Sequence, residues 1–162
     1  MSLPPISPGI LSGTTAVAGI MGWPIGHSRS PRLHGYWLRE YGVDGVYLPL
    51  AAPPDRIEAA FRGLPGLGFR GVNVTIPHKI TALGVCDRVD DVAARIGAVN
   101  TIIVTEDGAL SGTNTDAFGF LENLRQESDW RGADGPAVVL GAGGAARAVC
   151  VALLDAGAPE VR

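Results

Sequence analysis

The chain has 162 residues, of which 46% are hydrophobic and 18% are charged, and its formal net charge is −3. This length suits one ordinary domain or one and a half small ones, and this composition is typical of a chain that buries a core. The negative charge and the scattered arginines argue against a nucleic-acid-binding protein.

Neither a membrane protein nor a metal protein is indicated by the sequence. No apolar run approaches the ~20 residues of a membrane span, and residues 1–14 read as a loose leader rich in Pro, Ser and Gly, without the pattern of a signal peptide. We therefore expect a cytoplasmic protein. Cys86 and Cys150 lie in apolar surroundings, which favours buried free thiols over a disulfide. His27 and His34 have no Cys or acidic cluster beside them, so we expect no metal site.

The first predicted elements are a strand, a loop and a helix. Residues 15–21 form a short apolar run that predicts a buried strand, and residues 22–26 predict a loop. Ser30 and Pro31 then predict a helix start, with Ser30 as the N-cap and Pro31 at the first helical position. This helix should end near Gly42 and bury an apolar face made of Leu33, Trp37 and Leu38.

Strands and helices then alternate along the chain. We expect strands over residues 46–50, 71–76, 98–105 and 109–112, the last two joined by a turn, and helices over residues 54–61, 79–83, 89–96 and 114–126. This order indicates an α/β protein with largely parallel sheets. Residues 127–135 are polar and contain glycine, and they are the best candidate for a domain boundary.

The pattern after this boundary is that of a nucleotide-binding turn. Residues 137–140 predict a continuous apolar strand, and a helix should follow over residues 145–156. Between them, Gly141, Gly143 and Ala146 fit the spacing G-x-G-x-x-G/A, in which small residues let a pyrophosphate approach the backbone at a helix N-terminus. The alternative is a strand-to-helix turn that is merely rich in glycine.

Lys79 stands out because it is the only lysine among thirteen basic residues. Arginine keeps its proton at any working pH, whereas lysine can release one, so this position is a candidate for proton transfer. A codon bias toward arginine, with one lysine left by chance, is the competing explanation.

Further polar residues follow predicted strands. Ser28 and Ser30 lie at a helix start, where hydroxyls can bind a small carboxylate; for Ser30 alone, ordinary capping is the stronger interpretation. Asn73 and Thr75 share one face of their predicted strand and suggest the wall of a polar pocket.

Two more candidates lie at the start of later elements. Asn100 follows a turn of small residues, and Asp116 begins a predicted helix, where an acid would also complement the helix dipole.

Taken together, five segments resemble one known family. They are Gly-Trp-Pro-Ile-Gly-His-Ser-Arg-Ser-Pro (22–31), Asn-Val-Thr-Ile-Pro-His-Lys (73–79), Gly-Ala-Val-Asn-Thr (97–101), Gly-Thr-Asn-Thr-Asp (112–116) and Gly-Ala-Gly-Gly-Ala (141–145). Their order and spacing closely resemble the shikimate dehydrogenase family, from residue 17 to the end of the chain.

The resemblance implies two domains with an active site between them. An α/β substrate domain with a three-layer arrangement and a mainly parallel sheet would span residues 15–127, and the first part of a Rossmann NADP-binding domain would span residues 128–162. The implied reaction is the reversible, NADPH-dependent reduction of 3-dehydroshikimate to shikimate, a step of chorismate and aromatic amino-acid biosynthesis.

The resemblance also implies residue roles. Lys79 would be the catalytic acid and base, working with Asp116. Ser28 and Ser30 would hold the substrate carboxylate, while Asn73, Thr75, Asn100 and Asp116 would bind its ring hydroxyls. The residues expected to bind the cofactor are Gly141, Ala142, Gly143, Gly144, Ala145 and, more loosely, Asp91.

The chain also departs from the family pattern. Gly35 follows His34 where the family usually has Asn, which should weaken the helix locally. Family members continue well beyond this length, so we expect a fragment or a truncated product with little or no turnover.

The residue that contacts the cofactor ribose should lie about 20 positions past the glycine-rich turn, and only 16 residues follow Ala146 in the sequence. The residues alone therefore leave open whether the cofactor is NAD or NADP. A shikimate-binding module without redox activity, a quinate/shikimate dehydrogenase and a folate-linked dehydrogenase of similar architecture are the alternatives, and the protein could be a monomer or a homodimer.

Overall fold

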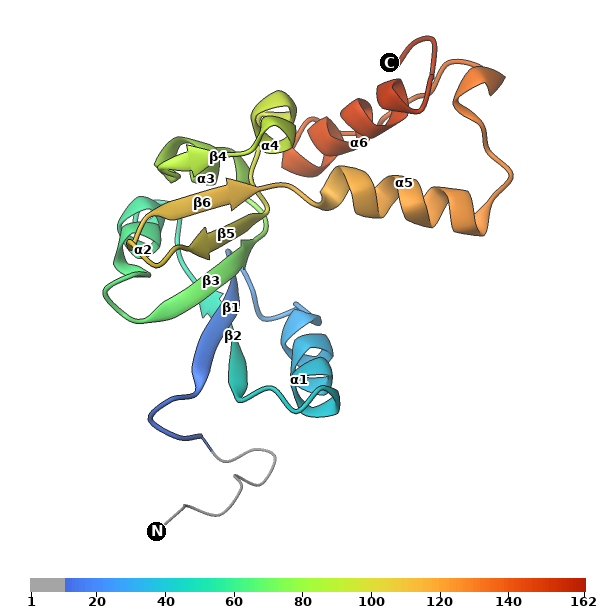
Figure 1. The fold of residues 1–162 in the computed structure, drawn as a ribbon. Helices are drawn as coiled ribbons and strands as arrows, with labels where there is room; N and C mark the ends of the chain where they lie inside the picture. The colour runs from blue at the N-terminus through green and yellow to red at the C-terminus, as the bar shows by residue number, and fades with distance from the viewer. Residues whose placement is uncertain (1–10) are drawn as a thin grey trace.

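The computed structural model describes residues 11–162, so most of the predicted leader (residues 1–14) lies outside the described residues. The chain forms an α/β fold, which confirms the predicted class (Figure 1). The strands are β1 (Ala16–Gly22), β2 (Gly45–Ala51), β3 (Phe69–Val74), β4 (Arg88–Val89), β5 (Thr101–Val104) and β6 (Leu110–Thr113). The α-helices are α1 (Ser30–Glu40), α2 (Ile57–Gly63), α3 (Lys79–Val85), α4 (Asp91–Ile96), α5 (Asp116–Glu127) and α6 (Gly144–Asp155), and η1 (Gly132–Asp134) is a short 3-10 helix.

One six-stranded sheet carries the fold, in the order β2-β1-β3-β5-β6-β4. β1 pairs in parallel with β2 and with β3, and β4 pairs in parallel with β6. β5 runs antiparallel to both β3 and β6, and the short turn between β5 and β6 makes them a hairpin. β3 and β6 therefore each have one parallel and one antiparallel neighbour.

Helices lie on both sides of this sheet (Figure 1). On one side, α2 and α3 pack on each other and on the sheet, and they contribute Phe61 and Ala82 to a core whose members are almost completely buried. Each large apolar side chain removed from water stabilises the fold by about 1.5–3 kcal/mol. On the other side, α1 lies against β1 and β2 and buries none of its residues completely.

The predicted apolar face of α1 was right for Leu38 and wrong for Leu33 and Trp37. Leu33 and Trp37 are 48% and 41% exposed, while His34 and Leu38 are the half-buried residues that face the sheet. The predicted cap was also wrong: Arg29 takes the N-cap position without a side-chain hydrogen bond, and Ser30 is the first helical residue.

Smaller differences concern element ends. The helix predicted over residues 54–61 begins at Ile57, and the strand predicted over residues 71–76 ends at Val74. Val89 belongs to β4 rather than to the following helix, because it pairs with Gly112.

The last segment of the chain packs on the sheet domain through two helices. Small residues of α6, Ala148 and Ala152, meet Ala117 of α5 and Ile96 of α4 in a second buried cluster. Two hydrogen bonds of 3.0 Å and 2.5 Å join the Arg95 guanidinium to the Asp155 carboxylate.

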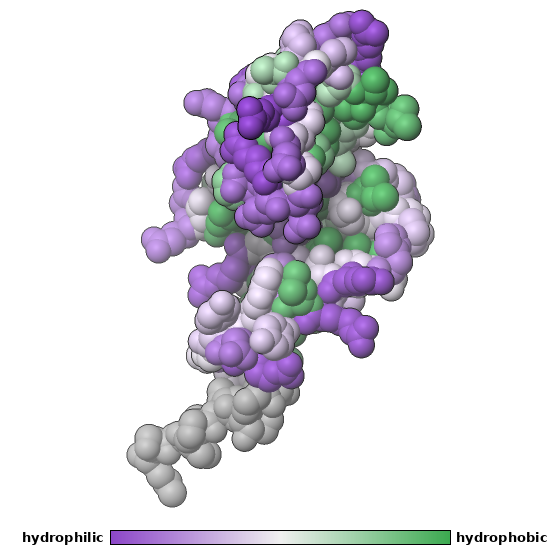
Figure 2. All heavy atoms as spheres, turned by 90° about the vertical axis from the view of Figure 1, so that its right-hand side faces the viewer, coloured by the Kyte–Doolittle hydropathy of each residue, from purple (hydrophilic) through white to green (hydrophobic). Residues whose placement is uncertain are grey.

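The predicted buried strand over residues 137–140 was wrong. This segment makes one isolated parallel bridge, between Ala137 and Val161, and its Val138 and Leu140 side chains are 69% and 96% exposed. Figure 2 shows hydrophobic residues, in green, on the surface of the upper part of the molecule, which is the part that contains α6 in Figure 1. An apolar run is buried only when neighbouring elements cover it, and the described chain places none on this segment.

Within residues 11–162, no helix is both long and apolar enough to cross a membrane. The same part of the chain has no cluster of three or more His, Cys, Asp or Glu side chains that could hold a metal. Cys86 and Cys150 are free and half-buried.

Candidate active site

The centre of the candidate site is an ion pair between the first residues of two helices. Lys79 begins α3, shortly after β3 ends, and Asp116 begins α5, shortly after β6. Lys79 Nζ donates a hydrogen bond to Asp116 Oδ2 at 2.5 Å, and the two side chains are 16% and 29% exposed. Partial burial strengthens such a pair because less solvent screens it.

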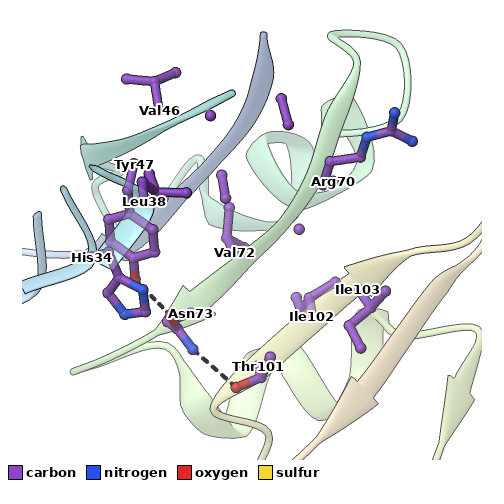
Figure 3. A pocket seen from close by; sticks show the side chains of 15 residues that line it. His34, Leu38, Val46, Tyr47, Arg70, Val72, Asn73, Thr101, Ile102 and Ile103 are labelled. Atoms are coloured by element: carbon purple, nitrogen blue, oxygen red, sulfur yellow. Dashed lines mark hydrogen bonds between the residues drawn. The ribbon is translucent and has the colours of Figure 1, made fainter. Parts of the chain in front are cut away.

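A chain of hydrogen bonds continues from Asp116 into the sheet. Asn100 Nδ2 donates to Asp116 Oδ1 at 2.8 Å, and Asn100 Oδ1 accepts from Thr101 Oγ1 at 2.9 Å. Thr101 Oγ1 in turn accepts from Asn73 Nδ2 at 3.0 Å, and Asn73 Oδ1 accepts from the Tyr47 hydroxyl at 2.6 Å (Figure 3). Every donor along this chain points toward Asp116, whose carboxylate only accepts.

The sheet explains why these residues meet. Asn73 on β3 is the direct cross-strand partner of Thr101 on β5, and Thr101 is the partner of Thr113 on β6. Directly opposed residues of antiparallel strands bring their side chains together. Asn100 stands one residue before β5 and is 8% exposed; its backbone N–H donates to Thr113 O at 3.1 Å. The switch to antiparallel pairing at β3 thus aligns the polar chain.

Thr75 and the loop that carries the two serines lie beside the end of β3. Thr75 N donates to Met21 O at 2.9 Å, and Trp23 N donates to Ile76 O at 3.0 Å, which fastens the loop after β1 to this segment. Ser28 and Ser30 are half-buried, and Ser28 Oγ accepts from Ser30 N at 3.3 Å. Among the described residues, no hydrogen bond joins either serine to the chain around Lys79.

His78 fixes the segment that leads to Lys79. Its side chain is 1% exposed, and Nε2 lies 2.8 Å from Ala52 O, beyond the end of β2. Because a carbonyl oxygen only accepts, Nε2 carries the proton of this bond. The backbone of Lys79 is held as well, since its carbonyl accepts from Val99 N at 2.8 Å.

The glycine-rich turn lies at the N-terminus of α6. Gly141 has a φ of +133°, a conformation that L side chains rarely adopt, and Gly143 is the N-cap of the helix. Gly141, Ala142, Gly143 and Ala145 are exposed, whereas Gly144 is half-buried against the Lys79 side chain. The first turn of α6 carries no acidic residue, so its free N–H groups present a positive end to solvent. This geometry can hold a phosphate group.

Asp91 does not join this turn. It is exposed at the start of α4, and no hydrogen bond within residues 11–162 involves its side chain. The neighbouring Asp90 has the local role instead: it is the N-cap of α4 and accepts from Ala93 N at 2.7 Å.

A cavity of about 310 Å³ lies between α1 and the sheet. Apolar groups of β1, β3 and β5 form most of its wall, and Tyr47, Asn73, Thr101 and His34 lie at one end (Figure 3). Lys79 is not part of its lining. The cavity therefore touches the far end of the polar chain rather than the ion pair. Burial raises the pKa of Tyr47 to about 12 and lowers the pKa of His34 below its ordinary value.

Sequence reasoning missed Tyr47, Thr101 and Thr115. Thr115 Oγ1 accepts from Asn100 Nδ2 at 2.9 Å. Thr101 and Thr115 each adjoin a predicted site residue, so their position beside Asn100 and Asp116 was an available clue. Nothing in the sequence around Tyr47 marks it, because its contact with Asn73 depends on β1 lying between β2 and β3.

The chain is similar to known proteins in sequence and in fold. The family model for the shikimate dehydrogenase substrate binding domain matches residues 20–102. A shikimate dehydrogenase (NADP(+)) of Rhodospirillum rubrum is 62% identical over 153 residues, which are 94% of this chain and 54% of the relative. Its counterpart in Paramagnetospirillum magneticum is 58% identical, over 94% of this chain and 55% of the relative. The chain spans about half the length of the curated relatives it matches.

Solved structures agree with the sequence relatives. The shikimate dehydrogenase of Aquifex aeolicus superposes with a TM-score of 0.88 at 37% identity, covering 94% of this chain and 57% of that one. The enzyme of Thermus thermophilus, solved in complex with NADP(H) and shikimate, gives a TM-score of 0.81 at 39% identity, covering 90% of this chain and 55% of that one.

Proposed function

Because this chain belongs to the shikimate dehydrogenase family, we propose that it carries the substrate site and the proton donor of an NADP-dependent shikimate dehydrogenase. The reaction is the reversible reduction of 3-dehydroshikimate to shikimate in aromatic amino-acid biosynthesis, in the cytoplasm. The single observation that carries this proposal is the 2.5 Å pair between Lys79 and Asp116, extended by Asn100 and Asn73.

The polar chain supplies the groups that a polyhydroxylated ring requires. Asn73, Thr75, Asn100 and Asp116 bind the ring hydroxyls, because amides, hydroxyls and carboxylates can each pair with a hydroxyl group. Ser28 and Ser30, at the start of α1, bind the carboxylate, which the positive end of the helix also favours. The loop that carries both serines is fastened to the segment after β3 by the bond from Trp23 N to Ile76 O.

Lys79 acts as the acid when a ketone is reduced. Hydride addition to the carbonyl carbon leaves negative charge on its oxygen, and the Lys79 ammonium stabilises this charge and gives the oxygen a proton. Asp116 holds the ammonium in place through Oδ2, while Asn100 fixes the carboxylate through Oδ1. In the reverse direction, the neutral amine takes the proton back from the alcohol.

The residues of the glycine-rich turn fit a dinucleotide cofactor. A Cβ at Gly143 would meet no atom within 4 Å, which leaves open space beside the N-terminus of α6. Gly141, Ala142, Gly143, Gly144 and Ala145 would hold the pyrophosphate of NADP through backbone N–H groups. When bound, the reduced cofactor supplies the hydride. The proposal extends to Asp91, the first residue of α4, because α4 contacts α6.

Two assays of the 162-residue chain test the proposal. Shikimate binding is measured by calorimetry, and NADPH oxidation is followed with 3-dehydroshikimate. Binding that disappears in Asp116→Ala supports the site, whereas an undiminished affinity in that variant, or no binding by the unchanged chain, contradicts it.

One observation favours a second function, a binding module without redox activity. The segment before the glycine-rich turn makes one isolated bridge and leaves Leu140 96% exposed, so the sheet that normally flanks such a turn is not assembled within residues 11–162. Shikimate binding without NADPH oxidation by this chain would support the module.

A further inference from the structure

Tyr47 lies outside the family motifs, yet its hydroxyl begins the hydrogen-bond chain that ends at Lys79. The hydroxyl donates to Asn73 Oδ1 at 2.6 Å, which is the shortest link between Tyr47 and Thr101. Within residues 11–162, Asn73 Oδ1 has no other hydrogen-bond donor. An asparagine amide can turn by half a circle and exchange its oxygen for its nitrogen, so its orientation depends on its partners.

The contacts of Asn73 define the orientation that its amide has in the structure. The Tyr47 hydroxyl donates to the Asn73 oxygen, and the Asn73 NH₂ group donates to Thr101. Thr101 uses its single proton toward Asn100 Oδ1, which leaves its oxygen free to accept from Asn73. If the amide turned, Thr101 would have to direct its proton to the Asn73 oxygen, and Asn100 Oδ1 would lose that donor.

Tyr47 is itself held rigidly. The His34 ring stacks on it with centroids 4.0 Å apart and an angle of 4° between the planes (Figure 3). His34 comes from α1, and its ring also meets Trp37 edge-on at 5.3 Å. Burial raises the pKa of Tyr47 to about 12, so the hydroxyl keeps its proton, and remains a donor, at neutral pH.

From these contacts we propose that Tyr47 is a positioning residue: it fixes the orientation of the Asn73 amide and, through Thr101 and Asn100, the polar face that the site presents to a hydroxylated substrate. This role rests on the proposed function, because Asn73 is taken there to bind a ring hydroxyl. Tyr47 acts through Asn73 and does not touch the substrate.

The test uses Tyr47→Phe, which removes one oxygen and keeps the stacked ring. Tyr36→Phe is the matched control, since Tyr36 is 50% exposed on α1 and its hydroxyl makes no hydrogen bond among the described residues. We expect Tyr47→Phe to weaken shikimate binding about tenfold, the factor that matches the loss of one oriented hydrogen bond. Tyr36→Phe should leave the affinity unchanged.

A double-mutant cycle separates positioning from a general loss of structure. In an Asn73→Ala background, Tyr47→Phe should have no further effect on shikimate binding, because the amide that it orients is gone. An equal loss of affinity with and without Asn73, or no loss in Tyr47→Phe, would overturn the proposal.

A spectroscopic measurement decides the question without substrate. The side-chain NH₂ signals of Asn73 in a ¹H–¹⁵N spectrum of the full chain should shift in Tyr47→Phe and stay in place in Tyr36→Phe. If the unchanged chain fails to bind shikimate, the proposed function fails, while these signals still show whether Tyr47 orients Asn73. Unshifted Asn73 signals in Tyr47→Phe would refute the positioning role even if shikimate binds.

Discussion

Gly144 packs directly against the side chain of Lys79. A Cβ added at Gly144 would lie 2.9 Å from Lys79 Cβ and 3.2 Å from Lys79 Cδ, and 3.4 Å from the methyl group of Ala98. The glycine therefore lets the first turn of α6 approach the helix that begins at Lys79. This contact links the turn proposed for the cofactor with the residue proposed as the acid.

Gly144→Ala should lower the stability of the chain by about 1–3 kcal/mol, the usual effect of extra carbon in a packed contact. Urea unfolding followed by circular dichroism gives the change. Gly143→Ala is the control, since a Cβ there meets nothing within 4 Å. In a Lys79→Gly background, where the nearest contacts are absent, Gly144→Ala should be far less harmful. A loss of the same size in both backgrounds would show that the contact with Lys79 is not responsible.

Lys79→Ala should reduce kcat by about 10²–10⁴-fold, because it removes the proton donor, and leave shikimate affinity comparatively intact. Lys79→Arg is the informative companion, since arginine supplies charge without a transferable proton. Steady-state kinetics of 3-dehydroshikimate reduction and of shikimate oxidation measure the effect, with a preparation of the unchanged protein that is active as the reference. Full turnover in Lys79→Ala would rule out the assignment of the acid.

Two glycines should respond in opposite ways to alanine. A Cβ at Gly71 would lie 2.4 Å from Ile102 O, a backbone atom of the neighbouring strand, so Gly71→Ala should destabilise the chain by about 3 kcal/mol. A Cβ at Gly35 meets nothing within 4 Å, and α1 is a regular helix there. Gly35→Ala should stabilise the chain by about 1 kcal/mol. Thermal unfolding of both variants checks the pair, and a destabilised Gly35→Ala would contradict the account of α1.

Asp107 should make the stability depend on pH in the acid range. Hydrogen bonds from Thr105, then from Arg88, lower the pKa of Asp107 from 3.8 to about 2. A carboxyl whose pKa is lower in the folded state contributes stability above its unfolded pKa and loses it as pH falls toward the folded pKa. In Asp107→Asn, the midpoint of thermal unfolding should therefore fall less steeply between about pH 4 and pH 2 than in the unchanged chain. Parallel curves for the two proteins would show that Asp107 does not contribute.

The sequence predicted most of the fold because periodicity and turn residues act locally. The strands near residues 46–50 and 109–112 and the helix after the glycine-rich turn are where they were expected. The exceptions needed tertiary context. Leu33 and Trp37 were expected beside Leu38 on the buried face, but α1 turns His34 toward the sheet together with Leu38 and leaves the other two exposed. Residues 137–140 are apolar enough for a strand and lack the neighbours that would bury them.

The sequence likewise predicted some residues of the candidate site but not the contacts between them. Lys79 could be proposed because it is the only lysine in the chain. Asn100 could be proposed because it follows a turn, and Asp116 because it begins a predicted helix. The order of their hydrogen bonds could not, since it depends on the antiparallel register that sets Asn73 opposite Thr101. The resemblance to a family named Lys79 and its partners, but Tyr47 needed the geometry.

The Lys79–Asp116 pair also makes the proposed site open to selective chemical labelling. Lys79 carries the only side-chain amine in the chain, and the structure leaves 16% of that side chain accessible beside Asp116. Amine-directed acylating reagents thus have two targets, the N-terminus and the proposed site. The mass of the acylated protein would show how many of these two amines have reacted, with no chromophore, coupled enzyme or engineered tag.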